Sequence, residues 1–412
     1  MGRVAITGMG VISPIGIGKE ALLESLKSNR IGIDRISLFD CSEDFPVKIG
    51  GEVKDFNPTE YMDRKVARRY DRVLQFAVAA AKMAYEDSGL DFDDSLAQRT
   101  AVLVTSGIGG FRTLWGEMKK YQKFGPNKVS PFLIPMMIVD MISGAVAIHL
   151  GLKGPNFSPV SACASSSHSI ALGTMFVEHG IADVAFVGGA EAVIDELPIA
   201  AFASMKALST RNEEPQKASR PFDKNRDGFV MSEGAAVLVL EREELAKARG
   251  AQIYGYIKGY GMTGDAYHLS APDPEGRGAA VAMKIAMEKA QLSPEDIQYV
   301  NAHATGTPVG DSAELKAVKK VMGKHSNEVV VNSTKGLAGH LLGAAGAFEM
   351  ICALLMMKEG FVHGHPNLEE PDDECEGLKV PKNEILNMEI TNFISNSFGF
   401  GGHNVSLVVG RG

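Results

Sequence analysis

Short runs of apolar, β-branched residues recur along the chain, and most lead through a glycine-rich turn into a helical pattern. Such runs predict buried strands, because strands covered on both faces carry continuous apolar residues. They occupy residues 4–7, 100–105, 184–188, 235–240, 300–301, 329–332 and 405–409.

Between these runs, apolar residues recur at helical intervals. The predicted helices span residues 71–88, 164–178, 278–290, 312–322 and 338–357. Strands that alternate with helices are typical of βα units. The pattern therefore predicts an α/β fold with a largely parallel sheet covered on both faces.

The chain shows a similar order of elements twice. A strand at residues 100–105 and a strand-to-helix turn near residue 163 come first; a strand at residues 300–301 and a similar turn near residue 340 follow. No linker rich in Pro, Gly and Ser separates the two parts. Identity between them is too low to prove a repeat, but the order suggests two fused copies, residues 1–250 and 251–412.

Composition narrows the class of protein. With 42 basic and 50 acidic residues among 412, the net charge of −8 argues against general affinity for nucleic acid or anionic membranes. The four cysteines show no paired spacing, so we expect neither a zinc site nor a disulfide framework.

The N-terminus lacks a signal-peptide pattern, and the apolar stretch 336–357 contains a histidine and a glutamate, which would be unfavourable inside a membrane. We therefore expect a cytoplasmic protein. Glycine is unusually frequent, at 45 residues, or about 11%.

Cys163 stands at a predicted strand-to-helix junction among small residues, SACASSS. A helix N-terminus favours the thiolate and would lower the thiol pKa, although a free cysteine is more often buried and inert. His303 and His340 follow predicted strands in glycine-flanked turns. Each alone is more often structural, but together the three residues predict a site at the ends of the strands.

Two further segments are candidates for function. The loop SFGFGG, around Phe400, offers backbone N–H groups that could stabilise an oxyanion, or is only a packed hairpin. A basic run with helical spacing, from Arg64 to Arg72, is either a solvated face or a docking surface for an acidic partner. No nucleotide-binding glycine motif is present.

These motifs resemble, in order, those of the β-ketoacyl-[acyl-carrier-protein] synthases of fatty acid synthesis, specifically the elongating type II enzymes and the related type I enzymes. The resemblance covers the whole chain, including HATGTPVGD at His303, STKGLAGHLLGAAG at Lys335 and His340, and SNSFGFGGHN at the end. It implies a thiolase fold of duplicated α/β halves in a five-layer αβαβα sandwich, an obligate homodimer and acyl carrier protein as the partner.

The resemblance also implies roles. Cys163 would carry the acyl group, His303 and His340 would stabilise the enolate formed from malonyl carrier protein, Lys335 would organise the histidines, and Phe400 would act as gate and oxyanion donor. No cofactor is required. Residues implied to bind substrate are Ile108, Phe202, Phe229, Ser270, Thr305, Thr307 and Phe398.

Two weaker sets come from the same resemblance. The residues implied to dock the carrier are Lys65, Arg68, Arg69 and Lys206. Those implied to hold a structural monovalent cation are Asn301, Glu349, Ser395 and Asn396. Alternative functions are a discrete polyketide-type ketosynthase, a non-catalytic chain-length factor, which the presence of Cys163 disfavours, and a cysteine hydrolase, which lacks support around Cys163.

Overall fold

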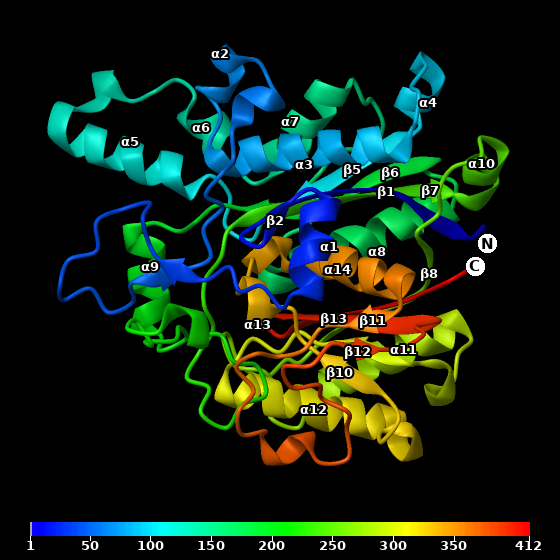
Figure 1. The fold of residues 1–412 in the computed structure, drawn as a ribbon. Coiled ribbons are helices and arrows are strands. Elements are labelled where there is room, and N and C mark those ends of the chain that lie inside the picture. The colour runs from blue at the N-terminus through cyan, green and yellow to red at the C-terminus, as the bar shows by residue number, and fades with distance from the viewer. Residues whose placement is uncertain (1) are drawn as a thin grey trace.

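Helices and strands alternate in five layers in this computed structural model, which describes residues 2–412 (Figure 1). The upper outer layer includes α3 (Arg72–Ser88) and α7 (Asp140–Leu150), and the lower one α11 (Arg277–Ala290) and α12 (Pro308–Met322). Between the sheets lie α8 (Ser165–Glu178) and α14 (Ala345–Glu359). The five-layer αβαβα prediction is therefore confirmed.

One hydrogen-bonded series of strands builds both sheet layers. Its order is β10-β9-β13-β14-β8-β1-β7-β6-β5, with β2 beside β1. The strands of the first half are β1 (Val4–Ser13), β2 (Gly16–Ile17), β5 (Thr100–Thr105), β6 (Val184–Glu191) and β7 (Gly234–Arg242). Those of the second half are β8 (Gly255–Gly264), β9 (Tyr299–Asn301), β10 (Val330–Asn332), β13 (Asn392–Gly399) and β14 (His403–Gly410).

The sheet is mixed, so the prediction of a largely parallel sheet is wrong. Only the pairs β5–β6, β9–β10 and β9–β13 are parallel, whereas β1, β7, β8 and β14 pair antiparallel with their neighbours. The strands β13 and β14 are joined by a short glycine turn, which forces the chain back antiparallel. The apolar runs indicated strands but carried no information on strand direction.

The two halves repeat one topology. In β5-β6-β7-β1 and in β9-β13-β14-β8, the first pair is parallel and the next two are antiparallel. This repetition supports the duplicated halves. The boundary at residue 250, which lies between α10 (Glu243–Ala248) and β8, stays a prediction.

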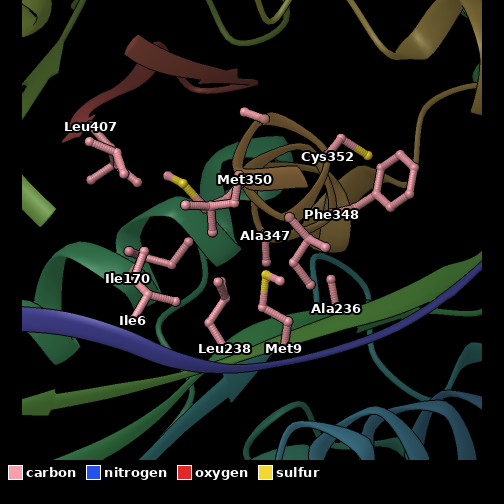
Figure 2. Packing of buried hydrophobic residues seen from close by; sticks show 14 of the residues in the cluster. Ile6, Met9, Ile170, Ala236, Leu238, Ala347, Phe348, Met350, Cys352 and Leu407 are labelled. Atoms are coloured by element: carbon pink, nitrogen blue, oxygen red, sulfur yellow. The ribbon is translucent and has the colours of Figure 1, made fainter. Parts of the chain in front are cut away.

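The central layer forms the largest core (Figure 2). Met350 of α14 and Ile170 of α8 pack between Ile6 and Leu238 of the upper sheet and Leu407 of the lower sheet. Every residue of α14 from Ala345 to Met357 is buried. Burial explains why this segment is apolar on all sides, and no helix within residues 2–412 has the length and hydropathy needed to cross a membrane.

The predicted helices mostly match, with one informative exception. The predicted helix 338–357 is broken: α13 (Lys335–Ala338) ends at Gly339, whose φ is +72°, and α14 begins only at Ala345. A positive φ ends an α-helix. His340 therefore lies in a turn between two helices, where its ring is available to a site.

The remaining elements surround this framework. The helices are α1 (Lys19–Lys27), α2 (Arg64–Ala67), α4 (Asp94–Gln98), α5 (Phe111–Phe124), α6 (Leu133–Met137) and α9 (Glu196–Ser204). The short strands are β3 (Asp34–Arg35), β4 (Ile49–Gly50), β11 (Phe361–Val362) and β12 (Leu386–Asn387). No disulfide joins the four cysteines, all of which are free.

Candidate active site

The nucleophile candidate lies in a tight turn before α8. Residues Ala162–Ala164 form a single 3-10 turn, and Ala162 has a φ of 52°. The Ser165 hydroxyl fixes this turn, since it donates to the Ala162 carbonyl at 2.6 Å and accepts from the Ser161 N–H at 2.9 Å. An L-residue at positive φ costs free energy, so the turn is held by its surroundings. The result presents Cys163 at the N-terminal end of the helix.

Cys163 opens onto a cavity of about 310 Å³ between the two halves of the chain. Apart from Cys163, the predicted site residues that line it are His303, His340, Phe400, Phe202, Phe229, Ser270, Thr305, Thr307 and Phe398. They come from segments up to 237 residues apart in the sequence, from Cys163 to Phe400. Folding therefore brings the three expected catalytic residues into one space.

The two histidines face each other edge to face. Their ring centroids are 5.4 Å apart with an interplanar angle of 83°. His340 is 1% exposed, and within residues 2–412 neither of its ring nitrogens has a hydrogen-bond partner. Burial lowers the pKa of both histidines well below its usual value, with the Lys335 charge acting in the same direction. Both rings are therefore neutral at pH 7, and His340 is ready to bind a polar group of a ligand.

Lys335 lies behind His303 and is itself buried, at 1% exposure. Its ammonium group forms a close ion pair with Glu349 and lies 3.5 Å from His303 Nδ1. Since an ammonium group only donates, His303 Nδ1 is the acceptor, and the neutral ring carries its proton on Nε2. Lys335 thereby fixes the tautomer of His303.

The thiol pKa differs from the sequence prediction. Burial raises the pKa of Cys163 to about 12, and the nearby Lys335 charge only partly opposes this rise. The prediction of a lowered pKa considered only the helix N-terminus. Removing the thiolate from water costs more free energy than its interaction with the helix N-terminus provides. Cys163 is therefore a protonated thiol at neutral pH.

The segment before Phe400 lies against the nucleophile turn. Gly399 is so close to this turn that a Cβ there would be 3.2 Å from the Cys163 nitrogen. Cys163 and Phe400 both line the cavity. The role of their backbone N–H groups as oxyanion donors, which the family resemblance implies, stays a prediction.

The polar wall of the cavity is a loop held by a buried carboxylate. The hydroxyl groups of Thr305 and Thr307 are 3.2 Å apart, and Gly306 between them has a φ of +85°. Asp311 accepts hydrogen bonds from the N–H groups of Gly306 and Thr307. Because these N–H groups are occupied, the threonine hydroxyls are the groups that can bind a polar ligand.

The opposite wall is aromatic. Phe202 packs against Phe229 at 5.6 Å and against Phe400 at 6.3 Å between ring centroids, and Phe398 lies 5.8 Å from His303. The cavity thus joins a polar wall to an apolar one at Cys163. This combination suits a ligand with a polar arm and an alkyl chain.

Comparison with known proteins assigns the family. Residues 1–246 match the β-ketoacyl synthase N-terminal domain, and residues 254–369 match the β-ketoacyl synthase C-terminal domain. This chain is a member of the β-ketoacyl synthase family. The synthase is 47% identical over 406 residues to 3-oxoacyl-[acyl-carrier-protein] synthase 2 of Staphylococcus aureus (strain N315), covering 98% of this chain and 97% of the relative.

Other relatives support the same family assignment. A protein of the same name from Coxiella burnetii is 45% identical, covering 99% of this chain and 98% of the relative. Among solved structures, a β-ketoacyl synthase from Burkholderia phymatum matches with a TM-score of 0.92 at 34% identity, and both chains are fully covered. The ketosynthase complex AntDE:AntF, a type II polyketide system with its acyl carrier protein, also matches with a TM-score of 0.92, at 28% identity, over the full length of both chains.

Two of the predicted catalytic and substrate-binding residues of this synthase, Ile108 and Lys335, do not line the cavity. Ile108 packs in an apolar cluster whose other members include Cys163, Phe202 and Phe229. Lys335 lies one layer behind His303. Both therefore contact residues of the cavity wall rather than the cavity itself.

The predicted docking residues lie in two separate places. Lys65, Arg68 and Arg69 are exposed near α2, whereas Lys206, also exposed, follows Met205 at the cavity. In Figure 1, α2 and α9 are well apart. The basic run is not one helical face, because α2 ends at Ala67 and α3 begins at Arg72.

Arg72, which the spacing placed on the same basic face, has another role. It is half-buried and makes a bidentate ion pair with the buried Glu233. A new helix N-terminus at Asp71 separates it from the exposed arginines. The free basic surface is therefore smaller than the sequence suggested.

The four residues predicted to hold a cation lie close together on β9, β13 and α14. The side-chain oxygens of Asn301, Ser395 and Asn396 each already accept a hydrogen bond from a neighbour. Glu349 Oε2 is buried, and within residues 2–412 it has no hydrogen-bond partner. A free carboxylate oxygen can bind a cation, but a cation requires several oxygen ligands. The cation site stays a prediction.

Several residues with a clear part in the site were missed from the sequence. Glu314 accepts from the N–H groups of His303 and Ala304, and His168 bonds the Ser161 hydroxyl at 2.7 Å beneath the nucleophile turn. Glu191 accepts from the N–H groups of Gly107 and Gly343 and so joins two loops. An acidic residue at the end of an apolar strand, as in FVGGAE, was the one available signal.

Proposed function

We propose that this synthase condenses an acyl group carried on Cys163 with malonyl-acyl carrier protein, giving 3-oxoacyl-acyl carrier protein and CO2. This is the elongation step of type II fatty acid synthesis. The observation that carries the proposal is the cavity in which Cys163 meets two neutral histidines, one of which, His340, has no partner for either ring nitrogen among the described residues 2–412. The names of the relatives at 45–47% identity support the substrate class.

In the first half-reaction, the Cys163 sulfur attacks the thioester carbonyl of an acyl carrier protein. The carbonyl oxygen becomes negative and accepts hydrogen bonds from the N–H groups of Cys163 and Phe400. The intermediate then expels the carrier thiol, which leaves with the proton of Cys163. Net proton transfer to the leaving thiol means that a raised thiol pKa does not oppose the exchange at equilibrium.

In the second half-reaction, malonyl carrier protein occupies the same cavity. Loss of CO2 leaves an enolate whose oxygen accepts from His303 Nε2–H and from the ring of His340. The enolate carbon attacks the acyl thioester, a C–C bond forms and the C–S bond to Cys163 breaks. The released thiolate takes up one proton, which restores the resting thiol.

The neutral state of His303 and His340 suits the decarboxylation step. A protonated imidazole would bind an enolate more tightly, but Lys335 and the low-polarity surroundings disfavour that charge on His303. With Nδ1 held by Lys335, His303 donates from Nε2 without losing its orientation. Lys335 is therefore a positioning residue for the decarboxylation.

The second candidate function is a discrete polyketide-type ketosynthase. One solved relative of that kind, AntDE:AntF, shares the fold at 28% identity. The fatty acid assignment is favoured because its named relatives are much closer, at 47% identity over nearly the full length. The two functions differ in the acyl group that Cys163 accepts.

The test is mass spectrometry of intact protein after incubation with acyl carrier proteins that carry alkyl or polyketide chains. We expect a single acyl adduct on Cys163 from straight alkyl chains, and its conversion to 3-oxoacyl carrier protein when malonyl carrier protein is added. Acylation by polyketide chains alone would favour the second candidate. Absence of any adduct on Cys163 would refute both.

We also propose that the basic residues Lys65, Arg68, Arg69 and Lys206 dock the acidic carrier. Each is exposed, and opposite charges increase the rate of encounter. The double change Arg68→Glu and Arg69→Glu should raise KM for carrier-linked substrates about tenfold and spare small thioesters. Lys324→Glu, at an exposed lysine on the 3-10 turn Gly323–His325, is the control. An equal effect on both substrate types would argue against docking.

We further propose a homodimer. The edge of the sheet at β5, with the segment 154–160 beside it, carries exposed large apolar side chains, which are otherwise unfavourable in water. Those near this edge are Ile148, Phe157, Val160 and Ile181. Light scattering should give twice the chain mass, and Ile148→Asp, at a side chain that is 71% exposed, should weaken the association.

A further inference from the structure

His363 and His365 are two buried histidines, 0% and 2% exposed, that follow β11 and that the reaction above does not use. Because a carbonyl oxygen only accepts, each ring donates from Nδ1: His363 to Gly364 at 2.8 Å and His365 to Pro381 at 2.7 Å. Burial lowers the pKa of His363 to about 3 and that of His365 to about 4, so both rings are neutral at pH 7. Nε2 of each ring is therefore a hydrogen-bond acceptor.

Both Nε2 atoms accept from the two residues that precede Lys335. The Ser333 N–H donates to His365 Nε2 at 3.0 Å, and the Thr334 hydroxyl donates to His363 Nε2 at 3.3 Å. Ser333 and Thr334 are fully buried, at 0% exposure. Since a buried donor that loses its partner destabilises the fold, the two rings fix the backbone that leads into Lys335.

Ser333 also connects this segment to His303. Its hydroxyl donates at 2.7 Å to the carbonyl of Ala304, the residue directly after His303. Lys335 lies two residues further along the chain than Ser333, and its ammonium group is 3.5 Å from His303 Nδ1. Ser333 therefore joins His365 to both residues of the pair Lys335–His303.

Packing restricts the two imidazole rings. His365 lies edge to face against Phe222 at 5.4 Å between ring centroids, and the centroids of the two imidazoles are 6.2 Å apart. On the other side, a Cβ on Gly336 would lie 3.7 Å from His365 Cδ2. The rings thus lie between the loop after β11 and the first turn of α13, so a change at either ring affects the segment that carries Lys335.

We propose that His363 and His365 are positioning residues for the decarboxylation, because they hold the segment that carries Lys335. This inference rests on the proposed function, in which Lys335 keeps the proton of His303 on Nε2, where it is donated to the enolate oxygen. A displaced Lys335 would leave Nδ1 free to take that proton, and Nε2 would no longer be a donor. Acylation of Cys163 does not use this donor.

The experiment compares two changes at His365 that each keep one of its hydrogen bonds. In His365→Gln, the side-chain oxygen replaces Nε2 and can accept from the Ser333 N–H. In His365→Asn, the amide nitrogen replaces Nδ1 and can donate to Pro381, but the Ser333 N–H loses its acceptor. The initial rates of labelled CO2 release from malonyl carrier protein and of acyl adduct formation on Cys163 are measured for each variant.

The two variants should differ in one step only. We expect His365→Asn to slow CO2 release about tenfold or more, because a buried N–H group without a partner displaces the segment before Lys335. His365→Gln should retain CO2 release within about threefold of the unmodified protein. Acylation of Cys163 should change by less than about twofold in both variants, since its oxyanion uses backbone donors.

Two further variants separate positioning from general stability. Thr334→Val removes only the hydroxyl that His363 accepts and should slow CO2 release about threefold, even where His365→Asn folds poorly. His325→Asn is the matched control, because His325 also donates to a backbone carbonyl, that of Ile297 at 3.1 Å, but on a 3-10 turn outside the cavity. We expect it to lower the melting temperature at most and to leave both rates unchanged.

Equal slowing of CO2 release by His365→Asn and His365→Gln, or equal slowing of CO2 release and acylation by His365→Asn, would overturn the inference. An unchanged rate of CO2 release in Thr334→Val would also overturn it. Failure of the proposed function gives a different result, since the unmodified protein would then form no acyl adduct and release no CO2. The two failures are therefore distinguishable in one experiment.

Discussion

The duplicated fold contains two versions of the same strand-to-helix turn, and only one of them carries a nucleophile. In the first half, Ala162 has a φ of 52° and Cys163 follows it before α8. In the second half, Leu342 has a φ of 47° and Gly343 follows it before α14. The two turns are in contact with each other. The two halves therefore share the backbone geometry of this turn, but only the first half has a nucleophilic side chain there.

The difference lies in the space next to each turn. The side chain of Cys163 faces the cavity, with both histidines on the same wall. At Gly343, the atoms that a Cβ would meet belong to Ser106, Gly107 and Glu191, which leave no room for a side chain. A strained turn at a helix N-terminus is therefore insufficient for a nucleophile. An open cavity with suitable partners decides which copy is active.

The largest expected effect comes from removing the side chain that distinguishes the active turn. Cys163→Ala should abolish both acyl-enzyme formation and condensation, because no other group at the turn can form the thioester. Activity assays with acyl and malonyl carrier protein, together with mass spectrometry, measure both steps. Cys41→Ala, at a half-exposed cysteine outside the cavity, serves as the control and should retain activity. Condensation by the Cys163→Ala protein would disprove the nucleophile assignment.

The histidine partners should give the next largest effect. His303→Ala or His340→Ala should slow decarboxylation and condensation about 100- to 1000-fold, since each removes a donor to the enolate oxygen. Acylation of Cys163 should fall by less than about tenfold, because its oxyanion uses backbone donors. Release of labelled CO2 and formation of the acyl adduct report the two steps separately. The exposed His179→Ala is the matched control, and loss of acylation alone would contradict the assigned role.

The protonation state of the Cys163 thiol gives a test with a smaller expected change in rate. With a pKa raised by burial to about 12, the thiolate fraction grows about tenfold per pH unit between about pH 7 and 9. The rate of Cys163 alkylation by iodoacetamide should rise in proportion, whereas the rate for a cysteine in an unstructured model peptide should level off above its ordinary pKa of about 8.5. A plateau for Cys163 near neutral pH would instead support the lowered pKa that the helix N-terminus predicted.

The smallest effect is expected at the inactive turn. Gly343→Ala should lower the free energy of unfolding by about 2 kcal/mol, because the added methyl group overlaps the Gly107 backbone in a close-packed region. Chemical denaturation measures this loss. Gly116→Ala in α5 has no atom within 4 Å of the added group and should not destabilise the protein. Equal stability of the two variants would show that the second turn has room for a side chain.

The sequence predicted the elements better than their arrangement. Helical periodicity predicted α3, α11 and α12 within a few residues, because each outer helix has one apolar face against a sheet, and it also predicted α8, which lies between the sheets. The apolar pattern missed the strand β8, whose glycines and half-buried residues hide it, and helical periodicity missed the break around His340. Strand direction could not be predicted, because it depends on pairing between segments such as β1 and β7, which lie more than 200 residues apart in the sequence.

The candidate site was predictable where motifs carry the chemistry. Cys163, His303 and His340 were found from their turns and from the family resemblance, and folding brings them into one cavity. The thiol pKa was mispredicted, because burial is a property of the folded chain. Supporting carboxylates such as Glu314 and Glu191 were missed, since they contact backbone groups that no motif identifies.

The position of β1 has a consequence for the way the chain is made. Val4, Ala5 and Ile6 pair on one side with residues 240–242 and on the other with residues 255–257. At roughly 5–20 residues per second, a ribosome needs on the order of ten seconds or longer to synthesise these partners after β1 has emerged. During that time β1, every residue of which is buried in the folded protein, has neither neighbour. We therefore expect the nascent chain to depend on chaperones until β8 is complete, and a fragment that stops before β7 to aggregate.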